Sequence, residues 1–323
     1  MSYLKIDSIL KSFQEGLPVI KNFSLDIPKG QIISLVGESG SGKSTLLRII
    51  AGLESRNEGE VFLNGVRVQN PKEQLVPGID EIQLVYQDYH LYPKSTVEEN
   101  ILRPLLLFEK KYKESRVEML LEMLGLKEFR DKLPRHLSGG QQQKVAIGRA
   151  LSVEPQVLLL DEPFSSLDTI QRRELIMELK SMFQDLGVTV LFVTHDLDDA
   201  LQMTNDLVIM QKGKLIQKGH PEEIFSKPKN LYAAKLFSHL NPLPNIEKTY
   251  IRPSDVQLFK TSGIPARIIE RQYLVHYNQL MVKLTDGTVW KIEDKKRVFA
   301  VGEKVFLKWE EGKEISFSKR LST

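Results

Sequence analysis

The sequence predicts an α/β domain built on a parallel sheet, interrupted by a helical insertion and followed by a small all-β domain. Short runs that are apolar throughout are typical of strands covered on both faces of a parallel sheet. A central stretch has helical periodicity, and a C-terminal stretch alternates apolar with polar residues. A length of 323 residues allows about two domains of ordinary size.

The predicted strands of the larger domain are the apolar runs at residues 31–36, 82–86, 157–160 and 188–193. The first run is followed by glycine-rich sequence and a predicted helix over residues 43–53. We expect the strands to form one parallel sheet, because such runs leave few polar side chains for solvent on either face.

The helical insertion is expected at about residues 96–155. Val117, Leu120, Leu121 and Leu124 recur at the spacing i, i+3, i+4, i+7, which places them on one face of a helix. We assign these residues to packing and not to chemistry.

The domain boundary is expected near residue 240, giving domains at 1–240 and 241–323. Residues 241–245 form a Pro- and Asn-rich stretch that is typical of a linker. Charge also changes there, since residues 1–240 carry 30 basic and 32 acidic side chains and residues 241–323 carry 15 and 10. In the second part, alternating runs flank Asp286-Gly287, which predicts a hairpin with a two-residue turn.

The composition excludes several classes of protein. The chain has no cysteine, which excludes disulfide frameworks, Cys-ligated metal sites and thiol catalysis. Its apolar runs are far shorter than the ~20 residues that cross a bilayer, and residues 1–7 lack the apolar core of a signal peptide. We therefore expect a chain that neither spans a membrane nor is exported by itself. A formal net charge of +3 is too small to indicate nucleic acid binding.

The strongest motif is a phosphate-binding loop. Residues 37–44 read Gly-Glu-Ser-Gly-Ser-Gly-Lys-Ser and fit the pattern G-x-x-x-x-G-K-[ST] between a predicted strand and a predicted helix, which argues against an ordinary glycine-rich turn. Glycines let backbone N–H groups close around phosphate oxygens, and the helix start adds the positive end of its dipole. Lys43 is expected to reach the β- and γ-phosphates, and Ser44 to supply an oxygen to Mg²⁺. The predicted nucleotide-binding residues of this segment are Gly37, Ser39, Gly40, Ser41, Gly42, Lys43, Ser44 and Thr45.

Two acidic residues, Asp161 and Glu162, directly follow the predicted strand at residues 157–160. That places them at the carboxyl edge of the sheet, where α/β proteins bind ligands. Asp161 is expected to hold Mg²⁺ through its water shell, and Glu162 to act as general base on the water that attacks the γ-phosphate. Alone, the pair could be a solvated acidic turn. The phosphate loop in the same chain favours the catalytic interpretation.

A third motif, Leu-Ser-Gly-Gly-Gln, occupies residues 137–141 just before a predicted helix. Ser-Gly-Gly at a helix start offers a concave set of N–H donors that suits a phosphate. Taken alone, this motif could equally be an N-cap serine followed by a flexible turn.

With these three motifs in this order, the chain resembles the nucleotide-binding subunits of ATP-binding cassette (ABC) transporters, for which Leu-Ser-Gly-Gly-Gln is the family marker. The resemblance implies a P-loop NTPase fold, with a RecA-like parallel-sheet core and a helical subdomain. It implies that the marker completes the nucleotide site of the other protomer in a head-to-tail homodimer around two Mg-ATP. The marker residues assigned to nucleotide are Ser138, Gly139, Gly140 and Gln141.

Four further positions match family elements. Gln87 resembles the glutamine that touches Mg²⁺ and senses the membrane partner, and His195 resembles the switch histidine on the γ-phosphate. Asp168, in Ser-Leu-Asp, resembles the D-loop aspartate. Phe13 resembles the aromatic that stacks on adenine, where the family more often has Tyr. The alternatives are a solvated turn for Gln87, a strand cap for His195 and plain core for Phe13.

Residues 251–256, Ile-Arg-Pro-Ser-Asp-Val, and the strands after them resemble the transport-associated OB-like domain of many ABC import ATPases. By its size, this appendage is most similar to those of ferric-iron and polyamine importers, then to those for sulfate, molybdate or sugars. The resemblance implies separate transmembrane permease subunits, an indirect solute-binding partner, and a peripheral place on the cytoplasmic face of the inner membrane. The aromatic-rich residues 86–93 are the expected exposed contact with the permease, or alternatively packing of the helical subdomain.

Other functions are less well supported. A soluble ABC ATPase of DNA repair needs a long coiled coil between Lys43 and Ser138, which are only about 95 residues apart, and ribosomal members usually carry two cassettes. A catalytically silent nucleotide-binding module conflicts with an intact Lys43, Glu162 and His195. No nucleic acid partner is expected, because the C-terminal part shows no basic stripe rich in aromatics.

Overall fold

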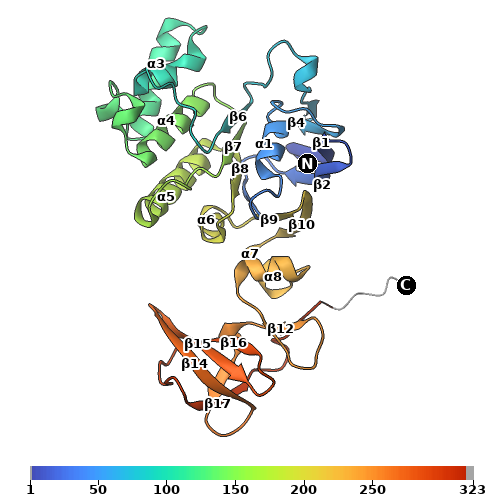
Figure 1. The fold of residues 1–323 in the computed structure, drawn as a ribbon. Coiled ribbons are helices and arrows are strands. Elements are labelled where there is room, and N and C mark those ends of the chain that lie inside the picture. The colour runs from blue at the N-terminus through green and yellow to red at the C-terminus, as the bar shows by residue number, and fades with distance from the viewer. Residues whose placement is uncertain (1, 318–323) are drawn as a thin grey trace. The chain divides into compact units, whose positions relative to one another are not determined.

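The computed structural model describes residues 2–317 and divides the chain into two compact units, Met1–Ile224 and Phe225–Thr323 (Figure 1). The division falls within helix α7 (Pro221–Ser226). The boundary that we expected near residue 240 lies C-terminal to this division and stays a prediction. Among the described residues, no helix is long and apolar enough to cross a membrane.

A six-stranded sheet lies at the centre of the first unit, in the order β10-β9-β3-β8-β7-β6. All neighbouring pairs are parallel except β10 with β9. Every residue of β3, β7 and β8 is buried, as the wholly apolar runs predicted. The strands are β3 (Ile32–Val36), β6 (Ile82–Val85), β7 (Val157–Asp161), β8 (Thr189–Thr194), β9 (Leu207–Gln211) and β10 (Lys214–Gly219).

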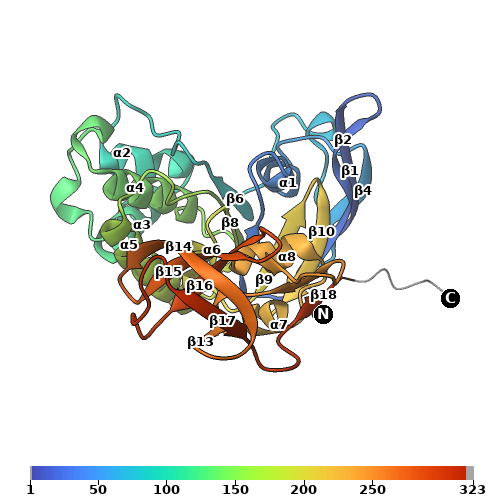
Figure 2. The same ribbon diagram turned by 60° about the horizontal axis from the view of Figure 1, so that its bottom comes forward.

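Helices cover both faces of this sheet. One face shares a core with α1, and the other shares a core with the helical insertion and α5 (Figure 2). Helix α1 ends at Ile50 and not at residue 53, because Gly52 adopts a left-handed φ of 68° that stops the helix. The helices are α1 (Lys43–Ile50), α2 (Val97–Leu102), α3 (Lys110–Met123), α4 (Gly139–Leu151), α5 (Thr169–Leu186) and α6 (Leu197–Met203), with 3₁₀ turns at Pro71–Glu73, Arg103–Leu105, Lys127–Phe129 and Pro134–His136.

The first unit also contains a four-stranded antiparallel sheet that the sequence analysis missed, in the order β2-β1-β4-β5. It covers α1 from the side away from the central sheet (Figure 2). Buried and exposed residues alternate clearly at the start of β1, with Leu4 and Ile6 buried. The register then shifts between Ile6 and Ile9, and Ser8 in this interval has a φ of 53°. An irregularity of this kind hides the period of two from the sequence. The strands are β1 (Leu4–Gln14), β2 (Leu17–Ile27), β4 (Glu58–Leu63) and β5 (Val66–Arg67).

The second unit confirms the small β domain. A five-stranded antiparallel sheet in the order β13-β17-β14-β15-β16 buries one face around the fully buried Trp290. The expected two-residue turn is wrong: Leu284 bonds to Thr288, which leaves three residues between them, with Gly287 at a φ of 88°. The elements are α8 (Leu231–Phe237), a 3₁₀ turn at Pro253–Asp255, β11 (Asn241–Pro242), β12 (Thr249–Ile251), β13 (Gln257–Phe259), β14 (Ile264–Leu274), β15 (Tyr277–Leu284), β16 (Val289–Asp294), β17 (Lys304–Lys308) and β18 (Ile315–Ser316).

Candidate active site

The phosphate loop connects β3 to α1 and curls tightly around its own backbone. A side chain at Gly37 would place its Cβ 2.3 Å from the Met210 carbonyl oxygen, and Gly42 has a φ of 101°. Only glycine allows the close approach at residue 37 and the positive φ at residue 42 without strain. Ser39, Gly40 and Ser44 are exposed on this loop, whereas Ser41 is buried and its Oγ has no hydrogen-bond partner among the described residues. Thr45 is half-buried in the first turn of α1.

The Lys43 side chain folds back over this loop. Its Nζ donates to the carbonyl oxygens of Gly37 and Glu38 at 2.9 and 3.1 Å. The residue is almost fully buried, and that burial lowers the pKa of Lys43 against the opposing attraction of Glu162 and Asp161. A cationic group is therefore held at the mouth of a loop whose N–H groups are suited to an anion.

Asp161 ends β7 and faces the start of α1. Its Oδ1 accepts a hydrogen bond from Ser44 Oγ at 3.0 Å. Burial raises the pKa of Asp161, partly offset by that hydrogen bond. Both groups offer oxygen atoms, which are the ligands that Mg²⁺ prefers.

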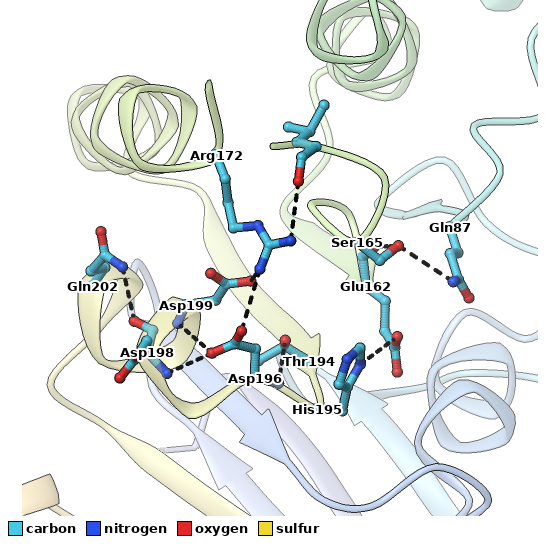
Figure 3. A network of polar contacts seen from close by, with 11 residues as sticks. Gln87, Glu162, Ser165, Arg172, Thr194, His195, Asp196, Asp198, Asp199 and Gln202 are labelled. Atoms are coloured by element: carbon cyan, nitrogen blue, oxygen red, sulfur yellow. Dashed lines mark hydrogen bonds and ion pairs between the residues drawn. The ribbon is translucent and has the colours of Figure 1, made fainter. Parts of the chain in front are cut away.

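Glu162 is held between a lysine and a histidine (Figure 3). Its Oε1 lies 3.7 Å from Lys43 Nζ, and its Oε2 accepts a hydrogen bond from His195 Nδ1 at 2.8 Å. The backbone adopts a φ of 45°, unusual for a non-glycine residue, while its N–H donates to the Val193 carbonyl of the neighbouring strand β8. Strand pairing thus places Glu162 beside His195, which directly follows β8.

Gln87 lies after β6, on the other side of Glu162 (Figure 3). Its Nε2 donates to Ser165 Oγ at 3.4 Å, and Ser165 Oγ donates in turn to the Glu162 carbonyl at 3.0 Å. Ser44, Gln87, Asp161 and Ser165 line one open pocket of about 800 Å³, a size typical of small-molecule sites.

The other predicted residues do not join this cluster within one chain. Ser138 is the N-cap of α4, where its Oγ accepts from the Gln141 N–H and the Gln141 side chain accepts from the Ser138 N–H. Asp168 likewise caps α5. Among the described residues, no hydrogen bond or ion pair connects Ser138, Gly139, Gly140 or Gln141 to the phosphate loop. Phe13 lies in β1 with 60% of its surface exposed, under the ammonium group of Lys11.

Comparisons with known proteins decide the family. Residues 20–165 match the family model described as ABC transporter. The chain is 33% identical to the spermidine/putrescine import ATP-binding protein PotA of Thermotoga maritima, over 94% of this chain and 92% of that protein. It is 35% identical to PotA of Bacillus cereus, over 98% and 99%. The chain belongs to the ATP-binding subunits of ABC importers.

Solved structures agree with this membership. The chain's fold is similar to that of cbiO1 of Clostridium perfringens, part of the ABC transporter complex cbiONQ, with a TM-score of 0.64 at 27% identity over 71% of this chain and 92% of that chain. It is also similar to the ATP-binding cassette MJ0796, in a dimeric post-hydrolysis state bound to ADP and Pi, with a TM-score of 0.59 at 31% identity over 67% and 98%. The predicted P-loop fold and the ATPase activity coupled to transport are therefore confirmed for this ABC subunit.

The structure corrects one expectation about the aromatic-rich residues 86–93 of this ABC subunit. Tyr89 is not exposed: it is 7% exposed and its hydroxyl is hydrogen-bonded to Ser166 Oγ. Tyr86 is half-buried, and of the three tyrosines only Tyr92 is exposed. The reason is that the Tyr89 side chain packs in the core shared by the helical insertion and α5, while Arg149 of α4 donates to the Tyr89 and His90 carbonyls.

Several polar residues that surround the site were not predicted from the sequence. Arg172, Asp196 and Asp199 form an ion-pair cluster next to Glu162 and His195 (Figure 3). The only local signal for any of them was the position of Asp196 directly before a helix, which is typical of an N-cap. Their meeting depends on the packing of α5 against α6, which no local pattern indicates.

Proposed function

We infer that two copies of this chain hydrolyse ATP at shared sites and so power polyamine uptake through separate permease subunits. The observation that carries the catalytic part is Glu162, whose carboxylate lies between the Lys43 ammonium and the His195 ring. A carboxylate held in this way is oriented before substrate arrives, which is what a general base needs.

The residues of the site fit Mg²⁺ as well as ATP. Within residues 2–317, no group of three or more His, Asp and Glu side chains forms a dedicated metal cage. Mg²⁺ bound with a nucleotide needs no such cage, because phosphates and water supply most of its ligands. Ser44 Oγ and Asp161 Oδ1, 3.0 Å apart, are the oxygens that would hold it, with Gln87 beside them. When bound, it would neutralise charge on the phosphates.

Each protein group then has a distinct task. The loop from Gly37 to Thr45 binds phosphate through its N–H groups, and the buried Ser41 hydroxyl, unpaired among residues 2–317, is available to it. Lys43 binds the β- and γ-phosphates. Glu162 takes a proton from the attacking water, and His195 orients Glu162 while contacting the γ-phosphate.

The homodimer is proposed because one chain leaves the marker apart from its own phosphate loop. Ser138, Gly139, Gly140 and Gln141 are satisfied locally by capping α4, and we assign them to the nucleotide bound by the other copy. Asp168 is assigned to the same shared interface, and Phe13, exposed on β1, to the adenine. The similarity to a dimeric cassette supports this arrangement.

Polyamine as the solute is supported by full-length relatives. The relatives named spermidine/putrescine import proteins align over 94–98% of this chain, which includes the C-terminal β unit and not only the cassette. The inference places the subunit on the cytoplasmic face of the membrane, bound to permease subunits. A solute-binding protein delivers the polyamine to these permease subunits.

The test is solute-stimulated ATP hydrolysis by the subunit assembled with its permease and solute-binding protein in vesicles. Spermidine or putrescine should raise the rate, whereas ferric iron should leave it at the basal level. The same assembly carrying Glu162→Gln is the control for hydrolysis by other proteins. Stimulation by iron and not by polyamine would contradict the assignment of polyamine as the solute. An unchanged rate in Glu162→Gln would contradict the role of Glu162 as general base.

A further inference from the structure

Two turns carry the side chains that the proposed mechanism uses for hydrolysis. Glu162 lies on the turn between β7 and α5, and His195 lies on the turn between β8 and α6. The two strands are parallel neighbours, with Asp161 paired to Val193. The distance between Glu162 and His195 therefore depends on how firmly the two turns are held to each other beyond the end of the sheet.

Arg172, in the first turn of α5, contacts both turns (Figure 3). Its Nη2 donates to the Leu167 carbonyl at 3.1 Å, within the segment that follows Glu162. Its Nη1 donates to Asp196 Oδ2 at 3.3 Å and lies 3.7 Å from Asp199 Oδ2, on the segment that follows His195. One guanidinium group thus spans the two segments.

Asp196 directly follows His195 in the chain, so a contact that holds Asp196 also restrains His195. Its Oδ1 caps α6 by accepting from the Asp198 and Asp199 N–H groups at 2.8 and 3.4 Å, which leaves Oδ2 for Arg172. Its own N–H donates to Thr194 Oγ1 at 3.0 Å. The residues on both sides of His195 are therefore fixed by hydrogen bonds, and Arg172 holds one of them.

Arg172 also borders the reacting groups. A cavity of about 40 Å³ is lined by both Arg172 and Asp199 and by Glu162 and His195. Yet within the part of the chain that the structure describes, no hydrogen bond or ion pair joins Arg172 to either Glu162 or His195. Any effect of Arg172 on hydrolysis must therefore pass through the turns.

We propose that Arg172 is a positioning residue, which clamps the turn after Glu162 to the turn after His195 and so sets the spacing of those two side chains. The inference rests on the roles proposed above for Glu162 and His195. The planar guanidinium is suited to this task, because it donates in fixed directions to a carbonyl and a carboxylate at once. A lysine offers a single point charge at the end of a flexible stem and cannot keep both contacts in that geometry.

The experiment compares Arg172→Ala and Arg172→Lys with Arg173→Ala in the full chain. Arg173 is the matched control, since it is the next residue of α5, carries the same charge and is exposed. For each variant, kcat and KM for Mg-ATP, nucleotide affinity and the midpoint of thermal unfolding are measured. We expect kcat to fall about tenfold or more in both Arg172 variants, because small misplacements of reacting groups cost that much. KM and nucleotide affinity should stay within about twofold of wild type, because no hydrogen bond or ion pair of the described residues joins the phosphate loop to Arg172.

Two results would overturn the proposal. The first is a kcat of both Arg172 variants equal to that of Arg173→Ala. The second is a fall in kcat matched by losses of nucleotide affinity and thermal stability, which is what a residue that only supports the fold would give. If Arg172→Ala does not fold, the kcat, nucleotide affinity and thermal stability of Arg172→Lys test the proposal by the same criteria. Glu162→Gln, assayed in parallel, distinguishes a failure of the proposed function from a failure of the proposed role of Arg172. Normal hydrolysis by Glu162→Gln contradicts the proposed function. An inactive Glu162→Gln together with fully active Arg172 variants contradicts only the role of Arg172.

Discussion

The Nδ1 atom of His195 donates a hydrogen bond of 2.8 Å to Oε2 of Glu162, across the carboxyl ends of two neighbouring parallel strands. The second carboxylate oxygen of Glu162 lies 3.7 Å from the ammonium of Lys43, which comes from a third strand-to-helix connection. Three segments far apart in sequence therefore meet at one carboxylate.

Replacing that carboxylate should stop hydrolysis but not binding. Glu162→Gln keeps the size and a hydrogen-bonding side chain but removes the general base. We expect hydrolysis to fall by at least about 100-fold, the usual contribution of such a base, while the variant still binds Mg-ATP and accumulates as a dimer. Steady-state ATPase assays and size-exclusion chromatography with nucleotide measure both effects. Glu174→Gln, on the exposed face of α5, is the control, and normal turnover by Glu162→Gln would remove Glu162 from its role.

Lys43→Ala should lose nucleotide affinity. The ammonium donates to two carbonyls of the loop that is assigned to the phosphates. A charge-assisted hydrogen bond of this kind contributes about 1.5–3 kcal/mol, so affinity should fall by roughly 10- to 150-fold. Titration with a fluorescent ATP analogue measures the change against Lys72→Ala, an exposed lysine outside the site. Equal affinities for the two variants would contradict the phosphate-loop assignment.

A bulky side chain at residue 138 should separate nucleotide binding from dimerisation. Ser138→Arg places a long cation at the surface assigned to the partner's nucleotide, so hydrolysis and dimer formation should be lost while the monomer still binds ATP. Because Ser138 also caps α4, the change removes about 1 kcal/mol of helix stability as well. Ser138→Ala removes the same cap without the bulk and is the matched control. Persistent hydrolysis by Ser138→Arg would show that the sites are not shared.

Asp199 should make folding stability depend on pH. Burial, reinforced by the nearby Asp196 and opposed by Arg172, raises the pKa of Asp199 to about 6 from an ordinary value of 3.8. The folded chain therefore holds this proton more tightly than the unfolded chain, so wild type loses stability as pH rises from about 4 to about 6. Asp199→Asn lacks this loss, and its stability relative to wild type should rise by up to about 3 kcal/mol across that range. Urea unfolding at pH 4, 5, 6 and 8 measures it, with Asp185→Asn, an exposed aspartate of α5, as the control; a difference that stays constant with pH would contradict the burial.

Two glycines test the antiparallel sheet that the sequence analysis missed. Gly59 and Gly65 have almost the same backbone, with φ of 82° and 80°, but a Cβ at Gly59 would lie 2.4 Å from the Asp7 carbonyl oxygen, whereas one at Gly65 meets nothing within 4 Å. Gly65→Ala should cost only the backbone strain, about 1 kcal/mol. Gly59→Ala should cost distinctly more, because β1 and β4 must move apart. Equal midpoints of thermal unfolding would mean that the two strands do not approach as described.

Several parts of the fold and the site could be predicted because their determinants are local. Wholly apolar runs predicted the buried strands β3, β7 and β8, and the phosphate loop was predicted from eight consecutive residues. The N-terminal sheet was missed because backbone irregularities such as Ser8 interrupt its alternation. The burial of Tyr89 was missed because the core in which it packs is formed by residues of the helical insertion and α5 that lie far away in the sequence.

By itself, the amino-acid order determined which groups could do chemistry and at the end of which strand or helix each one stands, since a strand, a helix start or a phosphate loop is specified within a few consecutive residues. Only the tertiary structure decided which of these groups meet. Strand β8 inserts between β3 and β7, and this order of parallel strands brings Lys43, Glu162 and His195 to one edge. The clamp by Arg172 arises in the same way, because α5 and α6 follow β7 and β8. Parallel neighbours need not be neighbours in sequence, so their pairing depends on how the whole sheet buries its two faces and not on any local pattern.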